Sequence, residues 1–118
     1  DIDNHQTLAL GWQSPHGKWN LEGQSGEKTS APISPRLKSD DMSTLKHAAA
    51  NGAGIVALPA YTCRAELESG QLTRILPNWH AGVAQLSLVT PVRKGQRQSV
   101  VALQEFLLTA FASAVAAP

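Results

Sequence analysis

The side chains able to do chemistry in this chain are four histidines, one cysteine and one pair of adjacent carboxylates. The histidines are scattered, at His5, His16, His47 and His80. They show neither the i, i+4 spacing nor the cysteine partners that a zinc site needs, so we expect no metal. Cys63 stands alone and can form no disulfide within the chain. No spacing fixes His47 or His80 beside it as a base, so we interpret Cys63 as a packed side chain.

The adjacent carboxylates, Asp40 and Asp41, have no second partner that would indicate acid–base catalysis. The chain has no Walker motif and no Gly-x-Ser-x-Gly elbow. Its glycine cluster at residues 52–54 precedes a strand-like run, the wrong context for phosphate binding. We therefore expect no enzyme and no cofactor. Trp12, Trp19 and Trp79 could stack on a ligand, although packing in a core or hairpin is the interpretation we favour.

The carboxylates are better placed to begin a helix. Met42, Leu45 and Ala49 follow at helical spacing, and acidic residues favour the positive end of the helix dipole. Asn51 and Gly52 are typical of the end of such a helix. Strand-like runs flank it, at residues 33–38 and at the continuous apolar residues 55–58, which predict a strand buried on both faces of a parallel sheet. The pattern predicts a βαβ unit.

The remaining elements are predicted from period and turn residues. Residues 7–10 and 18–22 are typical of a hairpin around a turn at residues 14–17, and polar residues 23–32 predict a solvated loop. Residues 61–69 predict a short helix closed by Gly70, and residues 72–76 and 84–91 predict strands. Apolar residues at helical spacing predict a last helix over about residues 99–115.

Composition indicates one soluble domain. The chain has 118 residues, of which 42% are hydrophobic and 16% charged, with a formal net charge of +1. No apolar run reaches the roughly 18 to 20 residues that span a bilayer, and no excess of positive charge indicates binding to nucleic acid or membrane. A chain with one cysteine and no signal peptide is expected in the cytoplasm, and a start without Met suggests a fragment.

Residues 39–79 carry a specific resemblance. They read SDDMSTLKHAAANGAGIVALPAYTCRAELESGQLTRILPNW. This order of capped helix, Gly-x-Gly-Ile strand ending in Leu-Pro, helix and Gly-x-Leu run ending in Leu-Pro resembles the effector-binding region of LysR-type transcriptional regulators. The flanks, His5-Gln6-Thr7-Leu8 and the residues from Thr90 to Phe111, resemble the start and the close of that region.

The resemblance implies an α/β fold with a mixed sheet flanked by helices, forming one lobe of a type 2 periplasmic-binding-protein-like fold. Residues 1–91 would be the second regulatory lobe. Residues 92–118 would be the closing segment and the C-terminal helix that packs on the first lobe. The DNA-binding domain and the first lobe would be absent from this chain. The apolar stripe of Leu103, Phe106, Leu107 and Phe111 would then lack its partner, so we expect association or a partly disordered C-terminus.

The resemblance also implies a function, in which a small-molecule effector binds in the cleft between lobes. It assigns one wall of that cleft to Ser39, Asp40, Met42, Ser43, Pro59, Ala60 and Tyr61. A helix N-terminus suits an anionic or polar ligand, but Asp40 and Asp41 would repel an anion, so the charge of the effector stays open. The implied partners are further copies of the chain, as dimers or tetramers, and DNA only through the absent domain, with no membrane. The alternative is a lobe of a periplasmic-type solute-binding protein.

Overall fold

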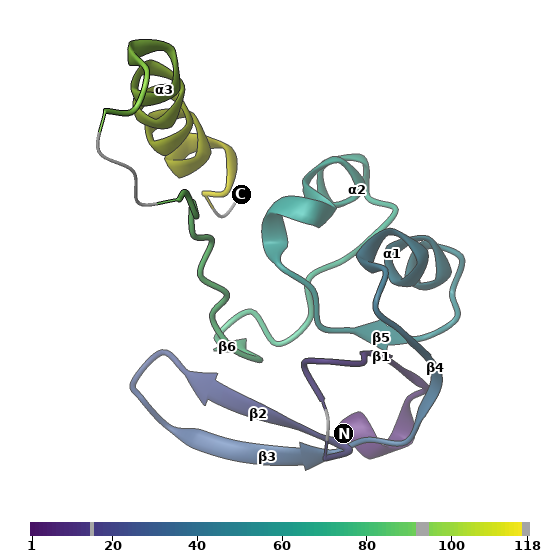
Figure 1. The fold of residues 1–118 in the computed structure, drawn as a ribbon. Coiled ribbons are helices and arrows are strands. Elements are labelled where there is room, and N and C mark those ends of the chain that lie inside the picture. Colours follow the sequence, from purple (N-terminus) through teal and green to yellow (C-terminus); the bar gives the residue numbers. More distant parts are fainter. Residues whose placement is uncertain (15, 92–94, 117–118) are drawn as a thin grey trace.

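Two small sheets and three α-helices make up the part of the chain that the structure describes (Figure 1). The computed structural model describes residues 1–14, 16–91 and 95–116. In chain order the elements are η1 (Ile2–Asn4), β1 (Thr7–Leu10), β2 (Lys18–Gly23), β3 (Lys28–Pro32), β4 (Pro35–Ser39), α1 (Met42–Ala50), β5 (Ile55–Val56), η2 (Ala60–Cys63), α2 (Arg64–Ser69), β6 (Trp79–His80) and α3 (Gln98–Ala114). One sheet is parallel, in the order β4-β1-β5, and the other is antiparallel, in the order β3-β2-β6. The predicted mixed α/β class is confirmed.

The core is organised around β1, whose four residues are all buried. Successive side chains of a strand point to opposite faces, and β1 supplies both faces of its sheet. Leu8 and Leu10 pack against Leu45 of α1. On the other face, Ala9 packs with Trp19 of β2 and with Ile33. The short apolar run of β1 is therefore that of a central strand covered on both faces.

The predicted βαβ unit is present as β4, α1 and β5, with one correction. β4 and β5 do not pair with each other, because β1 lies between them and pairs with both in parallel. The strand predicted at residues 55–58 is only Ile55–Val56 and is half-buried at the edge of the sheet. Val56 and Leu58 still pack against the cluster of Leu8, Leu10 and Leu45. Ile55 and Ala57 pack against the cluster of Ala9, Trp19 and Ile33, so both faces are covered as predicted.

The predicted hairpin of residues 7–10 with 18–22 is wrong, because β1 belongs to the parallel sheet. The hairpin that forms joins β2 to β3, from Lys18 opposite Pro32 to Glu22 opposite Lys28. The predicted solvated loop at residues 23–32 therefore contains a strand. β3 can be polar because it is an exposed edge strand that is held by backbone hydrogen bonds to β2. The turn predicted at 14–17 includes residue 15, which lies outside the described residues.

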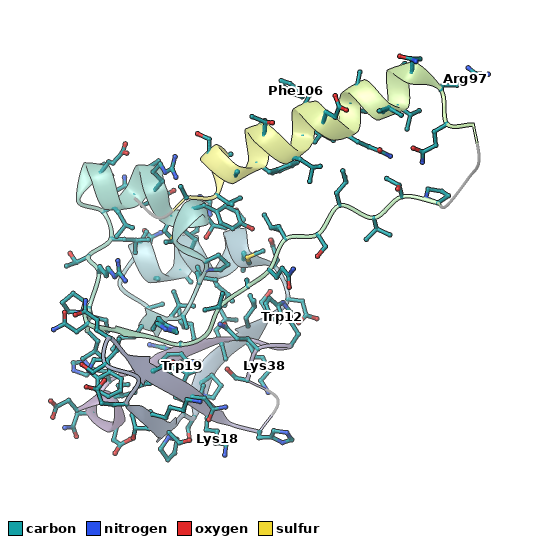
Figure 2. All side chains as sticks on the ribbon, turned by 90° about the vertical axis from the view of Figure 1, so that its left-hand side faces the viewer. Trp12, Lys18, Trp19, Lys38, Arg97 and Phe106 are labelled. Atoms are coloured by element: carbon teal, nitrogen blue, oxygen red, sulfur yellow. The ribbon has the colours of Figure 1, made fainter. Side chains whose placement is uncertain are left out.

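Two further predicted strands, at residues 72–76 and 84–91, are also wrong. After β5, the only strand residues of the described chain are Trp79 and His80, which pair with β2. Residues 84–91 leave the body without a partner strand in the described part of the chain, and a strand needs a neighbour to complete its hydrogen bonds (Figure 2). The helices do match: α2 ends at Gly70, in the left-handed region at φ 81°, and α3 is offset by one residue at each end from its prediction.

Helix α3 stands apart from the two sheets (Figures 1 and 2). The radius of gyration is 17.3 Å, against about 13 Å for a compact domain of this length. The guanidinium of Arg64, in α2, donates hydrogen bonds to the carbonyl oxygens of Ala114 (3.4 Å) and Ala116. Phe106, on the side of α3 away from the sheets, is 66% exposed. Within the described residues, no helix combines the length and apolar character needed to cross a membrane.

The core assignment predicts the effect of shortening Leu45, whose side chain is fully buried between α1 and β1. Leu45→Ala should lower the free energy of unfolding by about 2 to 5 kcal/mol, because it removes apolar contacts and leaves a cavity. Urea denaturation followed by circular dichroism measures this. Val83→Ala, at a side chain that is 88% exposed, is the control and should stay within about 0.5 kcal/mol. Equal effects of the two variants would contradict this core.

Candidate functional site

The carboxyl ends of the three parallel strands meet at one edge of their sheet. The backbone N–H of Gly11, just after β1, donates to the carbonyl oxygen of Ser39, at the end of β4 (3.1 Å). A Cβ at Gly11 would lie 2.6 Å from Oδ1 of Asp40, so this carboxylate comes close to the backbone and would have to shift if a larger residue replaced the glycine. The segment after β5 reaches the same helix, since η2 packs beside α1. In open α/β sheets, ligands bind outside this edge, which makes it the candidate site.

Helix α1 begins at this edge with an aspartate cap. Oδ1 of Asp41 accepts the backbone N–H of Ser43 (3.2 Å), and Oδ2 accepts the hydroxyl of Thr44 (2.6 Å). Oγ of Ser39 accepts the backbone N–H of Asp41 (3.0 Å). The hydrogen bond from the Thr44 side chain, followed by that from the Ser43 backbone, holds the pKa of Asp41 below its ordinary value of 3.8. A carboxylate of the chain itself therefore occupies the positive end of this helix.

The seven residues assigned from the resemblance lie in two groups along this edge. Ser39, Asp40, Met42 and Ser43 surround the start of α1, and Met42 also packs against the core cluster of Leu8, Leu10 and Leu45. Pro59, Ala60 and Tyr61 follow β5 and are half-buried. The carbonyl oxygen of Pro59 accepts both the N–H (3.1 Å) and the hydroxyl (2.7 Å) of Thr62. These two hydrogen bonds close the first turn of η2.

Trp12 is a residue of this edge that sequence reasoning did not assign to the site. Its indole is 59% exposed in the turn after β1, whereas Trp19 is 4% exposed and packs in the core as predicted. Large aromatic side chains gain most from burial, so an exposed one at the end of a central strand indicates a binding surface. The signal in the sequence was its position two residues after an apolar run.

The other reactive side chains have structural partners. Nδ1 of His47 lies 2.7 Å from the carbonyl oxygen of Ser43 one turn earlier. Nζ of Lys46 and Oε1 of Glu66 lie 2.9 Å apart, which ties α1 to α2 and holds the pKa of Glu66 below its usual 4.5. Cys63 is buried. In residues 1–14, 16–91 and 95–116, no three His, Cys, Asp or Glu side chains are grouped to hold a metal ion.

The family model for the LysR substrate binding domain matches residues 1–112. The chain belongs to this family. Its fold is accordingly that of a type 2 periplasmic-binding-like domain, as the resemblance implied. The chain is a substrate-binding domain of the LysR-type transcriptional regulator family. No curated protein sequence matches the chain significantly.

Solved structures agree with the family. The regulatory domain of AphB from Vibrio vulnificus is 28% identical, with a TM-score of 0.60, over 70% of this chain and 40% of that one. Full-length AphB from Vibrio cholerae, a virulence activator of the LTTR family, is 27% identical, with a TM-score of 0.58, over 69% of this chain and 27% of that one. The chain thus spans about 40% of the length of the AphB regulatory domain that it matches.

The capping arrangement predicts a pH dependence. The pKa of Asp41 is lowered in the folded chain, so its contribution to stability is present above about pH 3.8 and is lost as the pH falls through the folded value. Asp41→Asn should lower the melting temperature at neutral pH and flatten its fall toward about pH 3. Asp40→Asn is the matched control, since Asp40 accepts no hydrogen bond within the described residues. Parallel pH profiles for Asp41→Asn and the unmodified chain would disprove the capping role.

Proposed function

We propose that this domain senses a small-molecule effector at the carboxyl edge of its parallel sheet and thereby controls a DNA-binding regulator. The observation that carries the proposal is the convergence of three strand ends on one edge, with the exposed Trp12 in the turn whose Gly11 contacts Ser39 just before α1. Ser39, Asp40, Met42 and Ser43 form one part of the wall, and Pro59, Ala60 and Tyr61 form the other. Family membership supports a ligand site, and the convergence of strand ends supports locating it at this edge.

The chemistry of this edge favours an effector that is not a simple anion. Asp41 already fills the anion position at the start of α1, and the carboxylate of Asp40 lies against Gly11. An anion would meet two negative charges there, each of which raises the cost of binding it. A ring that stacks on Trp12, with hydrogen-bond donors facing Asp40, matches the groups present.

We assign residues 1–91 to the second lobe and residues 92–118 to a closing segment and helix that pack on a first lobe. The support is the exposure of apolar side chains after β6: Val83 is 88% exposed, Val89 is 87% and Phe106 is 66%. Monomeric proteins rarely leave contiguous apolar surface of this kind uncovered. Further copies of the chain would complete the regulator as a dimer or tetramer.

Control of DNA affinity requires the effector to bind one arrangement of the lobes better than another. A ligand held between Trp12, α1 and an opposing lobe would make its full set of contacts only when the lobes are closed. The alternative, a lobe of a solute-binding protein, shares this fold and this closure. The family match favours the regulator, and a helix-turn-helix encoded upstream of this region in the gene would decide between them.

The test is a ligand-dependent thermal shift on the regulator with both lobes, screened against small metabolites and aromatic acids. A ligand present at about 100 times its dissociation constant adds about 2.7 kcal/mol of stability to the state that binds it. Trp12→Ala and Asp40→Asn should each weaken binding by about tenfold, which is about 1.4 kcal/mol. His16→Ala and Asp3→Asn, at exposed positions outside the proposed wall, are the controls. If the effector raises the melting temperature of Trp12→Ala and of Asp40→Asn as much as that of the unmodified regulator, the effector binds elsewhere.

A further inference from the structure

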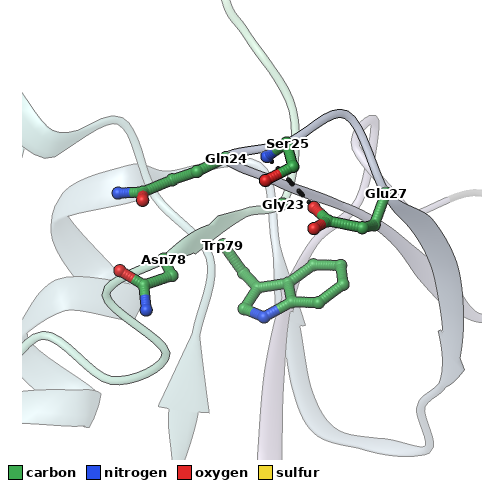
Figure 3. Close-up of a pocket in the computed structure, with 6 residues that line it drawn as sticks. All are labelled: Gly23, Gln24, Ser25, Glu27, Asn78 and Trp79. Carbon is green, nitrogen blue, oxygen red and sulfur yellow. Dashed lines mark hydrogen bonds between the residues drawn. The ribbon is translucent and has the colours of Figure 1, made fainter.

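The antiparallel sheet carries a second cavity, distinct from the carboxyl edge of the parallel sheet. Its volume is about 240 Å³, and it is lined by Gly23, Gln24, Ser25, Glu27, Asn78 and Trp79 (Figure 3). One wall is the turn between β2 and β3, and the other is the start of β6. This volume lies below the roughly 300 to 1,000 Å³ of pockets that enclose drug-sized ligands, so it suits one small group.

The backbone holds the two walls together. The N–H of Gly23 donates to the carbonyl oxygen of Glu27 (2.8 Å), which closes the turn, and Gly23 pairs with Trp79 across the sheet. The N–H of Gln24 donates to the carbonyl oxygen of Asn78 (3.1 Å), which joins the turn to the residue before β6. A site fixed by backbone hydrogen bonds loses little freedom when a ligand enters.

A carboxylate and an aromatic ring meet in this cavity. Oε2 of Glu27 accepts the N–H of Ser25 (3.1 Å), which orients the carboxylate across the turn. A Cβ at Gly23 would collide with that oxygen and would lie 3.5 Å from Cη2 of Trp79, so the glycine leaves room for both groups. Figure 3 shows the carboxylate beside the indole ring. The one ion pair within the described residues joins Lys46 and Glu66, which leaves Glu27 without a cationic partner among them.

We propose that this cavity binds an organic cation, an alkylammonium or guanidinium group. Glu27 would pair with its charge, the ring of Trp79 would attract it through its quadrupole, and the amides of Gln24 and Asn78 would accept its remaining N–H groups. Tryptophan is the best aromatic partner for such a group. Trp79 begins β6, and the segment that leads to α3 follows this strand directly. A bound cation would therefore lie at the start of that segment.

The test is a titration of the chain with ethylammonium and with ethylguanidinium, followed by NMR at the Nε1–H signals of its three tryptophans. The Trp79 signal should move to saturation with one of these cations, and sodium chloride at equal ionic strength should not move it. Glu27→Gln and Trp79→Leu should each weaken binding at least about fivefold. Glu68→Gln is the matched control, which changes the same residue type at an exposed position outside the cavity and should leave binding intact.

Gly23→Ala keeps both binding groups but displaces the Glu27 carboxylate, and it should weaken binding as Glu27→Gln does. It provides a second measurement if Trp79→Leu does not fold. A shift that fails to saturate, that sodium chloride reproduces, or that survives Glu27→Gln and Gly23→Ala would overturn a site for free cations.

The cation could also be a lysine or arginine side chain of a second copy of this chain. Sedimentation distinguishes this source, because association that Glu27→Gln abolishes and Glu68→Gln does not would assign the cavity to that side chain. If free cations do not bind and Glu27→Gln leaves the association state unchanged, the proposal is wrong for both sources.

Discussion

The structure depends on the burial of one four-residue strand from both sides. β1 is enclosed by β4 and β5 at its edges, by α1 on one face and by the antiparallel sheet on the other. Its alternating side chains therefore join two cores, and the shorter strand β5 contributes one side chain to each. A charge at Leu8 would disrupt the first core and a charge at Ala9 the second, since neither face offers water or a partner.

This burial also determines where the proposed ligand site lies. Because β4 and β5 both run parallel to β1, the segments that follow all three strands emerge at one edge, although they lie far apart in the sequence. The caps of α1 then decide what that edge can recognise. Asp41 serves the helix, which leaves Asp40 and Trp12 as the groups with unused binding capacity.

The sequence predicted the local elements of this fold well. α1, α2 and α3 carry their own signals in caps, periodic apolar residues and Gly70, because a helix closes its hydrogen bonds within itself. Strand pairing is set between distant segments, and it was predicted poorly. β1 reads equally well as half of a hairpin, β3 is too polar to be noticed as an edge strand, and residues 84–91 have strand composition without a neighbouring strand.

The site was predicted in the same uneven way. The resemblance assigned the site to the start of α1 and the turn after β5, which stays a prediction. Burial alone separates Trp12 from Trp19, and burial depends on tertiary packing. The pairing of Gly23 with Trp79, which creates the second cavity, joins residues more than fifty positions apart through a two-residue strand that no pattern indicated.

The contact of Arg64 with the end of α3 has a thermodynamic consequence. It closes a loop of 52 residues, and closing a flexible loop of that length costs about 3.5 kcal/mol of chain entropy. Two hydrogen bonds from a charged donor contribute about 3 to 6 kcal/mol at most, and less where water competes for them. The two quantities nearly cancel, so the guanidinium can orient α3 but cannot hold it alone. A surface that covered the apolar face of α3, as proposed above, would decide where the helix lies.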